Sequence, residues 1–367
     1  ISLKCYGIKT KNCSLILMPR YYTRACNFYY GKISKSLVKE KKSLPLNGNK
    51  EISFDQIELI SRNSKKKIKI NELKNLPKLL KKQVTQDLKN ITAKKKNFAN
   101  LNFNKSPNIM GVLNLTPDSF SDGGNFNTKT KGIKQALKMF ASGASIIDIG
   151  GESTRPGSKG VNVKVEWNRI NKILKSISKK IPISLDTRKS EIMQKGIKLG
   201  VKIINDVSGL NYDPKTINIL NNYKIPFVLQ HSQGAPETMQ NNPAYKNVLL
   251  DIYDFFDKKI QFLRSIGIKH NNIIIDPGIG FGKNLKHNMN LICNISIFHS
   301  LGFPVLVGIS RKKFIKELSG DNDTKNRTGG TISSAIYLMM QGVQILRVHE
   351  VNEILQGIKV FKNLIKN

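Results

Sequence analysis

The sequence predicts an α/β fold, a (β/α)8 or TIM barrel preceded by a basic N-terminal extension. Two observations lead to this prediction. From residue 109 onward, short apolar runs rich in β-branched residues alternate with amphipathic stretches eight times, a pattern typical of a parallel sheet covered on both faces. Each run also ends in polar or glycine-rich residues, and the carboxyl ends of all eight strands of a closed barrel share one rim.

The eight predicted strands, in chain order, are residues 109–114, 145–149, 181–186, 202–206, 226–231, 273–276, 304–309 and 345–348. Amphipathic segments separate them, as the helices of a barrel would. A single Asp at a strand end is more often a helix cap than a catalytic group. Polar side chains at all eight ends are better explained by a site on the shared rim.

Composition narrows the class of protein. The chain has 367 residues, of which 39% are hydrophobic, and four cysteines at positions 5, 13, 26 and 293. Their spacing supports neither a disulfide framework nor a thiolate zinc site, so we expect a cytoplasmic protein. The apolar run at residues 14–18 is far shorter than the roughly 18 residues that cross a bilayer, so we expect no membrane contact.

The excess of positive charge is concentrated before the barrel. Residues 1–107 hold 25 Lys and Arg against 6 Asp and Glu, a net charge of +19, while the remaining 260 residues have +17. Lysine clusters at 65–67 and 94–96 fit a polyanion-binding surface. Because the whole chain is rich in lysine and shows no nucleic-acid-binding module, we expect no nucleic-acid partner.

The region before the barrel divides into two predicted parts. Residues 1–17 precede the first methionine, Met18, and are treated as an upstream segment outside the fold. Residues 18–107 are the basic extension, and residues 108–367 the catalytic domain. Within the extension, residues 50–62 alternate like a strand and residues 72–93 form a basic helical pattern, so we expect it to be partly structured.

The first two rim loops carry groups suited to phosphate and a metal ion. Residues 114–124 read NLTPDSFSDGG, a loop whose length and composition suggest a lid. Asn114 offers a neutral oxygen to a hard cation such as Mg2+, and Asp118 and Asp122 are placed to support that cation or a developing positive charge. In the second loop, Thr154 and Arg155 are candidates for binding a phosphate or carboxylate.

Four side chains from different predicted strands form a second set: Asp186, Asn205, Asp276 and Lys312. Carboxylates accept hydrogen bonds from amino and ring N–H groups, and a lysine donates to a carbonyl or ring nitrogen, so the set can read the edge of a flat heterocycle. The carboxylates could equally be a general acid and base, or metal ligands. The spacing alone does not separate these readings.

Two further features complete the rim. Arg347 and His349 are two residues apart on one strand, so they face the same side and form a candidate anion site. The run IIIDPGIGFGK at residues 273–283 lacks the spacing of a dinucleotide-binding fingerprint. Its glycines at 278, 280 and 282 instead suit close approach of the backbone to a flat ligand.

Taken together, the motifs resemble those of the dihydropteroate synthase family: NLTPDSFSDGG (114–124), IDIGGESTRPGS (147–158), SLDTRK (184–189), INDVSG (204–209), DPGIGFGKN (276–284), GISRKKF (308–314) and LRVHEV (346–351). The resemblance spans about residues 108–362. It implies an enzyme of folate biosynthesis that joins 4-aminobenzoate to (7,8-dihydropterin-6-yl)methyl diphosphate, releasing diphosphate. It also implies a homodimer.

The resemblance assigns a role to each candidate residue. Asn114 matches the Mg2+ ligand, and Arg155, Arg347 and His349 match diphosphate-binding positions. Ser310 and Lys312 would lie near the aminobenzoate, and Phe281 near the pterin. The pterin contacts would be Thr154, Asp186, Asn205, Asp276 and Lys312.

Three positions depart from the usual family pattern. Gln230 and Ser232 stand where many members have methionine, and Lys313 replaces a common serine. Two other functions remain to be weighed. A pterin-dependent methyltransferase would share the barrel but lack the first two loops, and a non-catalytic pterin-binding protein would not need the intact metal and diphosphate positions.

Overall fold

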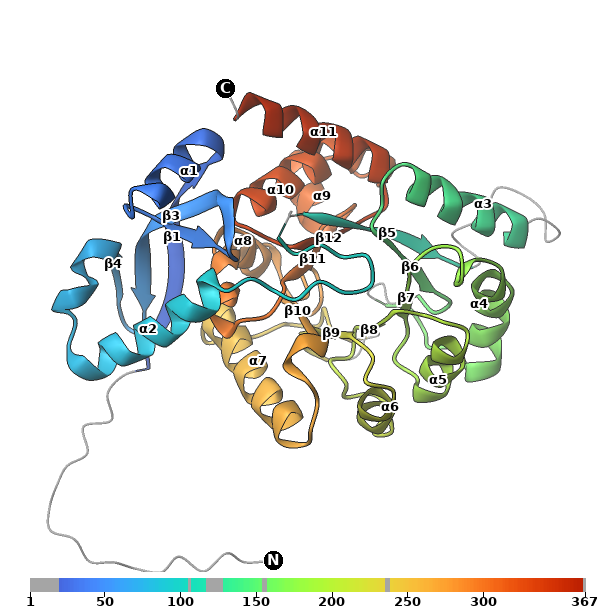
Figure 1. Ribbon diagram of the computed structural model, residues 1–367. Helices are drawn as coiled ribbons and strands as arrows, with labels where there is room; N and C mark the ends of the chain where they lie inside the picture. Colours follow the sequence, from blue (N-terminus) through green and yellow to red (C-terminus); the bar gives the residue numbers. More distant parts are fainter. Residues whose placement is uncertain (1–19, 105–106, 117–127, 154–156, 235–237, 366–367) are drawn as a thin grey trace, which may run out of the picture.

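A computed structural model describes residues 20–104, 107–116, 128–153, 157–234 and 238–365. An eight-stranded parallel sheet forms the larger part, in the order β10-β9-β8-β7-β6-β5-β12-β11. A bridge between Ile275 and Val305 joins β10 to β11 and closes the ring. Helices surround it on the outside (Figure 1). The predicted (β/α)8 barrel is therefore confirmed.

The barrel strands lie close to their predicted positions. They are β5 (Asn108–Asn114), β6 (Ile146–Gly150), β7 (Ile183–Asp186), β8 (Ile203–Asp206), β9 (Phe227–Gln230), β10 (Ile273–Asp276), β11 (Leu306–Gly308) and β12 (Ile345–Val348). The α-helices between and after them are α3 (Thr128–Ala141), α4 (Val163–Ile177), α5 (Ser190–Lys198), α6 (Thr216–Tyr223), α7 (Val248–Ser265), α8 (Leu285–Cys293), α9 (Lys313–Ser319), α10 (Thr328–Met340) and α11 (Val351–Leu364). The described part of the barrel also contains the 3-10 helices η3 (His270–Asn272), η4 (Ile295–Leu301) and η5 (Lys325–Arg327).

The barrel interior is filled at its amino end and polar at its carboxyl end. An inner hydrophobic layer is contributed by seven strands: Met110, Ile146, Ile203, Val228, Ile274, Leu306 and Ile345. Leu101 and Phe103, from the segment that precedes β5, pack into this layer from below. Because the strand side chains alternate, the next inward-facing residue of each strand belongs to the carboxyl-end rim.

Three of the helices that follow the rim begin at asparagine caps. The side chains of Asn162, Asn247 and Asn284 accept hydrogen bonds from the backbone N–H three residues later, at 2.9, 3.2 and 2.9 Å. Such caps satisfy N–H groups that a helix start leaves unpaired. Each cap therefore fixes where a rim loop ends and its helix begins.

The N-terminal extension folds as a small α/β unit, which we call the N-terminal unit (residues 20–95). Its antiparallel sheet has strands β1 (Tyr22–Tyr30), β2 (Leu44–Leu46), β3 (Asn49–Ile60) and β4 (Lys65–Lys69), with β3 pairing to the other three. Its helices are α1 (Gly31–Lys39), η1 (Ile70–Asn75) and α2 (Lys78–Thr92). The strand predicted at 50–62 is β3. The helix predicted at 72–93 is divided, because Leu76 and Pro77 are extended.

The N-terminal unit packs against the barrel flank formed by α7, η4 and the end of α10 (Figure 1). Tyr22 and Ile60 belong to the same hydrophobic cluster as the barrel helices. Ser296 donates to the carbonyl of Ala25 at 2.9 Å, and Tyr30 donates to the carbonyl of Met340 at 2.8 Å. These two residues thus extend the barrel core into the unit, which also has a separate core of its own around Phe54 and Ile57.

Candidate active site

The carboxyl-end rim of the barrel surrounds a cleft of about 720 Å³. Six predicted site residues, from β5, β12 and the segments after β10, β11 and β12, line it together: Asn114, Phe281, Ser310, Lys312, Arg347 and His349. Arg347 reaches from this lining to carboxylates on the strands below. We call that deeper layer, formed by Asp148, Asp186, Asn205 and Asp276, the floor of the site.

The floor is organised around a doubly ion-paired arginine. Arg347 donates through Nε to Asp148 at 2.6 Å and through a terminal nitrogen to Asp186 at 2.8 Å. Asn205 donates to the same Asp148 oxygen at 3.0 Å. The four groups come from β12, β6, β7 and β8, so one network joins strands on both sides of β5.

Asp148 is a member of the floor that was not predicted from the sequence. It is fully buried in the middle of an otherwise apolar strand. The available signal was strand alternation: Asp148 is two residues after Ile146, whose side chain is in the inner layer, so it must face the barrel interior. A buried carboxylate there requires a cationic partner, which Arg347 supplies.

Burial changes the proton affinity of the floor carboxylates. It raises the pKa of Asp186, an effect that Arg347 opposes and the Asp148 carboxylate reinforces. Burial also raises the pKa of Asp276 to about 6, against the hydrogen bond from the Gly278 N–H. That bond is 2.7 Å long. Both shifts follow from the poor solvation of a buried negative charge.

Lys312 and Phe281 form the side wall next to the floor. The Lys312 Nζ lies 4.3 Å from the centre of the Phe281 ring, a cation–π contact. Burial, together with the charge of Arg347, lowers the pKa of Lys312 to about 8, while Asp276 and Asp186 act to raise it. An ammonium group and an aromatic face are thus presented together to whatever occupies the cleft.

The glycine run after β10 brings backbone close to the loop after β9. Gly278 has φ +68°, and a Cβ there would lie 2.0 Å from the carbonyl oxygen of His231. Lys283, which was also not predicted from sequence, donates to the carbonyl of Phe281 at 2.8 Å and lies 3.1 Å from the His231 ring nitrogen. Burial lowers the pKa of Lys283 to about 7.

Ser310 and His349 are in contact with each other in the lining of the cleft. The His349 Nδ1 and the Ser310 hydroxyl are 3.0 Å apart, and Ser310 donates to Glu350 at 2.8 Å. Arg311 also pairs with Glu350. Glu350 was not predicted as a site residue. It follows His349 in the sequence, and nothing in the sequence indicates that its carboxylate contacts Ser310 and Arg311, which follow a different strand.

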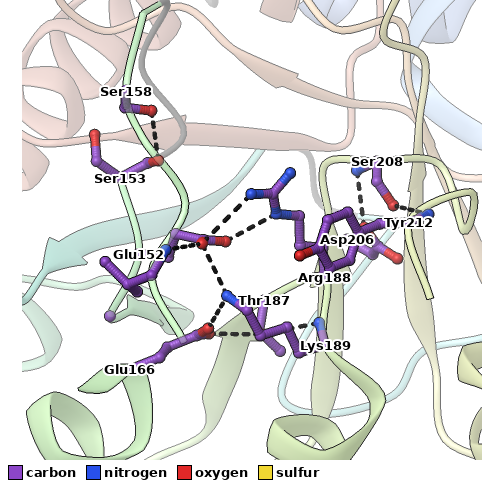
Figure 2. Close-up of polar contacts among 12 residues, drawn as sticks. Glu152, Ser153, Ser158, Glu166, Thr187, Arg188, Lys189, Asp206, Ser208 and Tyr212 are labelled. Atoms are coloured by element: carbon purple, nitrogen blue, oxygen red, sulfur yellow. Dashed lines mark hydrogen bonds and ion pairs between the residues drawn. The ribbon is translucent and has the colours of Figure 1, made fainter. Parts of the chain in front are cut away.

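A buried ionic cluster, which we call the β6–β7 clamp, joins two rim loops (Figure 2). Lys189 Nζ lies 2.8 Å from Glu152 and 2.6 Å from Glu166, and Arg188 Nε lies 2.9 Å from Glu152. Glu152 also accepts the Val161 N–H at 2.8 Å. The loop that begins with Glu152 is thereby held at both ends to the segment that follows Asp186.

The clamp extends to a third loop through stacking. The Arg188 guanidinium lies 4.0 Å from the ring centre of Tyr212, in the segment after β8; both side chains are labelled in Figure 2. Thr187 donates to Glu166 at 2.6 Å. The motifs GGEST and SLDTRK were evident in the sequence, but the pairing of their charges with each other was not.

Four predicted site residues lie outside the described residues: Asp118, Asp122, Thr154 and Arg155. Asn114, the predicted metal ligand, lines the cleft at the end of β5. Within the described ranges there is no group of three or more His, Cys, Asp or Glu side chains that could hold a metal ion. A single amide oxygen fits a Mg2+ ion that keeps most of its waters and takes its other ligands from substrate phosphates.

Several floor atoms have hydrogen-bonding capacity left over. Asp148 Oδ1, Asp186 Oδ1 and Asn205 Oδ1 are buried and have no hydrogen-bond partner in the described part of the chain. Buried polar atoms are normally paired, so unpaired acceptors in one layer indicate a ligand that brings its own N–H donors. A flat heterocycle with amino and ring N–H groups meets this requirement.

Comparison with known proteins gives the class to which the barrel and floor belong. Residues 110–349 match the model of a family described as pterin binding enzyme. The chain is 40% identical over 256 residues to dihydropteroate synthase of Escherichia coli strain K12, covering 69% of this chain and 90% of that protein. A Synechocystis dihydropteroate synthase is also 40% identical, over 254 residues, covering 69% and 88%.

Solved structures similar to this chain belong to the same family as these relatives. The dihydropteroate synthase of Yersinia pestis, in complex with a sulfonamide drug, is 36% identical with a TM-score of 0.67, covering 71% of this chain and 95% of that one. That of Xanthomonas albilineans, with 4-aminobenzoic acid, is 34% identical with a TM-score of 0.67, covering 71% and 93%. The chain belongs to the dihydropteroate synthase family. It is a transferase of folate biosynthesis.

None of the helices in the described ranges is long and apolar enough to span a membrane.

Proposed function

We propose that this enzyme condenses 4-aminobenzoate with (7,8-dihydropterin-6-yl)methyl diphosphate in the rim cleft, forming 7,8-dihydropteroate and diphosphate. The floor supports the proposal most directly. Its unpaired acceptors on Asp148, Asp186 and Asn205 complement the amino and ring N–H groups of a pterin. Asp276 adds a carboxylate, and Lys312 adds a donor for a carbonyl or ring nitrogen.

The aminobenzoate is assigned to the mouth of the cleft. Phe281 offers an aromatic face, and Ser310 and Lys312 offer polar groups near it. A planar arylamine packs favourably against an aromatic ring, and its carboxylate is attracted to an ammonium group.

The diphosphate is assigned to the cationic part of the cleft lining. Arg347 and His349 line the cleft there, with Thr154 and Arg155 assigned from the sequence. Asn114 would hold a Mg2+ ion against the phosphate oxygens, supported by Asp118 and Asp122. When bound, Mg2+ neutralises negative charge on the leaving diphosphate.

The reaction breaks the bond between the pterin methylene carbon and the diphosphate oxygen. The bonding electrons leave with the diphosphate, whose charge Arg347 and His349 stabilise. The remaining methylene cation is conjugated with the pterin ring and stabilised by Asp186, whose ionised form is favoured by the charge of Arg347. The arylamine nitrogen then bonds to the carbon and releases one proton to solvent, so no strong general base is needed.

The experiment follows diphosphate release from the pterin diphosphate, with and without aminobenzoate and with and without Mg2+. We expect release coupled to dihydropteroate formation only when both are present. Asn114→Ala and Lys312→Ala should each lower kcat/KM by about 100-fold or more, as removal of a transition-state contact does, while retaining the wild-type fold by circular dichroism. Full activity of both variants would contradict the site assignment.

The same assay separates the competing functions. Transfer of a methyl group from a methylpterin donor, without use of aminobenzoate, would indicate a methyltransferase. Binding of pterin without turnover under any combination would indicate a binding protein. A homodimer, implied by the family resemblance, and a cytoplasmic location, expected from the cysteine spacing, are also part of this proposal. Light scattering of the purified enzyme measures the oligomeric state.

A further inference from the structure

Gln230 ends strand β9 on the inner wall of the barrel. Val228 belongs to the inner hydrophobic layer and Leu229 packs toward the helices, so strand alternation turns Gln230 back to the interior, one layer above Val228. Its side chain is only 3% exposed. The pairing of β9 with β10 places Gln230 beside Asp276. The amide therefore belongs to the same layer as the floor carboxylate.

The amide of Gln230 has an unused donor. Its Nε2 is buried and has no hydrogen-bond partner among the described residues. Leaving a buried donor unpaired lowers stability, so such a group calls for an explanation. On the two preceding strands, Asp186 Oδ1 and Asn205 Oδ1 are also buried without partners. Three consecutive strands thus contribute one donor and two acceptors with unmet capacity.

The surrounding backbone restricts the amide. A Cβ at Gly278 would lie 3.4 Å from the Gln230 Cγ and 2.0 Å from the His231 carbonyl oxygen. The loop after β10 therefore packs directly against the Gln230 side chain. The stem of the Gln230 side chain is thus covered by this loop, and strand alternation turns the side chain toward the barrel interior.

We propose that Gln230 donates a hydrogen bond to an acceptor atom of the pterin ring and so determines part of the specificity for that ring. This inference rests on the proposed function, because it names a further contact in the same site. A pterin carries carbonyl and ring-nitrogen acceptors beside its N–H donors. A ring with no acceptor at this point leaves Nε2 unpaired, and buried polar groups discriminate strongly against such analogues.

The position distinguishes this chain from the many family members with methionine there. Methionine has a similar length but no N–H donor, so Gln230→Met removes the proposed hydrogen bond with little change in volume. Gln230→Leu removes it with a different apolar shape. Gln261→Met, at an exposed position of α7, is the matched control for introducing methionine elsewhere.

The experiment measures the Kd for 6-carboxypterin by its fluorescence, and the Michaelis constant for aminobenzoate in the diphosphate-release assay. Gln230→Met and Gln230→Leu should weaken 6-carboxypterin binding about 5- to 20-fold, the effect of one hydrogen bond. The Michaelis constant for aminobenzoate should stay within about twofold. Gln261→Met should match the wild type in both measurements.

Equal or tighter 6-carboxypterin binding by Gln230→Met would overturn the inference, and continued dihydropteroate formation would leave the proposed function intact. A similar rise in the Michaelis constant for aminobenzoate would also overturn it, since that result indicates general distortion. If Gln230→Met fails to fold, Gln230→Leu decides by the same criteria. Absence of pterin binding and turnover in the wild type would refute both proposals.

Discussion

Asp276 and Lys312 are a carboxylate and an ammonium whose ordinary pKa values lie far apart. Burial raises the pKa of Asp276 to about 6 and lowers the pKa of Lys312 to about 8. The pH range in which both groups are charged is therefore narrow. In the proposed site, pterin recognition through an ionised acceptor and a charged donor would depend on that range.

We predict a bell-shaped pH dependence of kcat/KM for the pterin diphosphate. Below pH about 6, Asp276 takes up a proton and loses acceptor capacity, so the rate constant falls as the pH decreases. Above pH about 8, Lys312 loses its proton and its charge, so kcat/KM falls again as the pH increases. Steady-state rates between pH 5 and 9 measure both limbs.

Two variants assign the limbs of this profile. In Lys312→Ala the residual activity should no longer fall near pH 8, although buried Lys283 remains in place. In Asp276→Asn the fall near pH 6 should disappear. An unchanged profile in both variants would show that other groups control the pH dependence.

Among the elements of the rim, the loop after β10 depends most clearly on glycine. Gly278 combines a positive φ of +68° with backbone 2.0 Å from any added Cβ, whereas Gly320 has φ +75° and open space around it. The two positions therefore share the backbone requirement but differ in packing. Comparing them separates strain in φ from steric overlap.

We predict that Gly278→Ala lowers the free energy of unfolding by about 3 kcal/mol or more, and Gly320→Ala by about 1 kcal/mol. Gly278→Ala should also weaken pterin binding, because the loop must move away from His231. Urea denaturation gives the two stabilities. Equal effects would mean that the loop after β10 relaxes without cost.

The β6–β7 clamp holds a rim loop through charges that are shielded from water. Glu152→Gln removes the carboxylate that pairs with Arg188 and one of the two that pair with Lys189, and breaking a buried ion pair costs about 3 kcal/mol. Glu191→Gln is the matched control, because Glu191 pairs with Lys195 on the surface and such pairs contribute about 0.5 kcal/mol. Denaturation midpoints that shift equally in the two variants would contradict this prediction.

The elements most accurately predicted from sequence are the barrel strands. Runs such as IIID at 273–276 place apolar residues on both faces of the strand. This pattern is typical of a parallel strand that is covered on both sides. The pairing of charged side chains between loops, in contrast, leaves no recognisable pattern in the sequence. Lys189 and Glu166 are 23 residues apart and meet because the barrel brings β6 and β7 together. Gln230 was noted as a departure, but its unpaired donor depends on the packing around it.

At the scale of the whole molecule, the N-terminal unit and the barrel are joined by apolar and ionic contacts. The Tyr22 ring packs edge-on against Tyr253 of α7, with centres 5.1 Å apart. Arg62 lies 2.7 Å from Asp254 of the same helix. A strand in this unit was predictable from the sequence, but its docking was not, because an antiparallel sheet carries no signal of which helix will cover it.

We predict that the N-terminal unit and the barrel unfold in a single transition. Cys26 is buried in the unit and Trp167, the only tryptophan, is on α4 of the barrel. In a variant with the other three cysteines changed to serine, Cys26 should react with a thiol reagent at the same urea concentration at which Trp167 fluorescence changes. Earlier reaction of Cys26 would show that the unit detaches first.

The docking of the N-terminal unit has a consequence for synthesis on the ribosome. The bond between Ser296 and Ala25 spans 271 residues, and that between Tyr30 and Met340 spans 310. At translation rates of about 5–20 residues per second, the unit emerges many seconds before the surface that covers it. During that interval Tyr22 and Ile60 lack their final apolar neighbours. The N-terminal unit is therefore synthesised before the barrel but is among the last parts to reach its native environment, and a nascent chain stalled before residue 296 should be a substrate for chaperones.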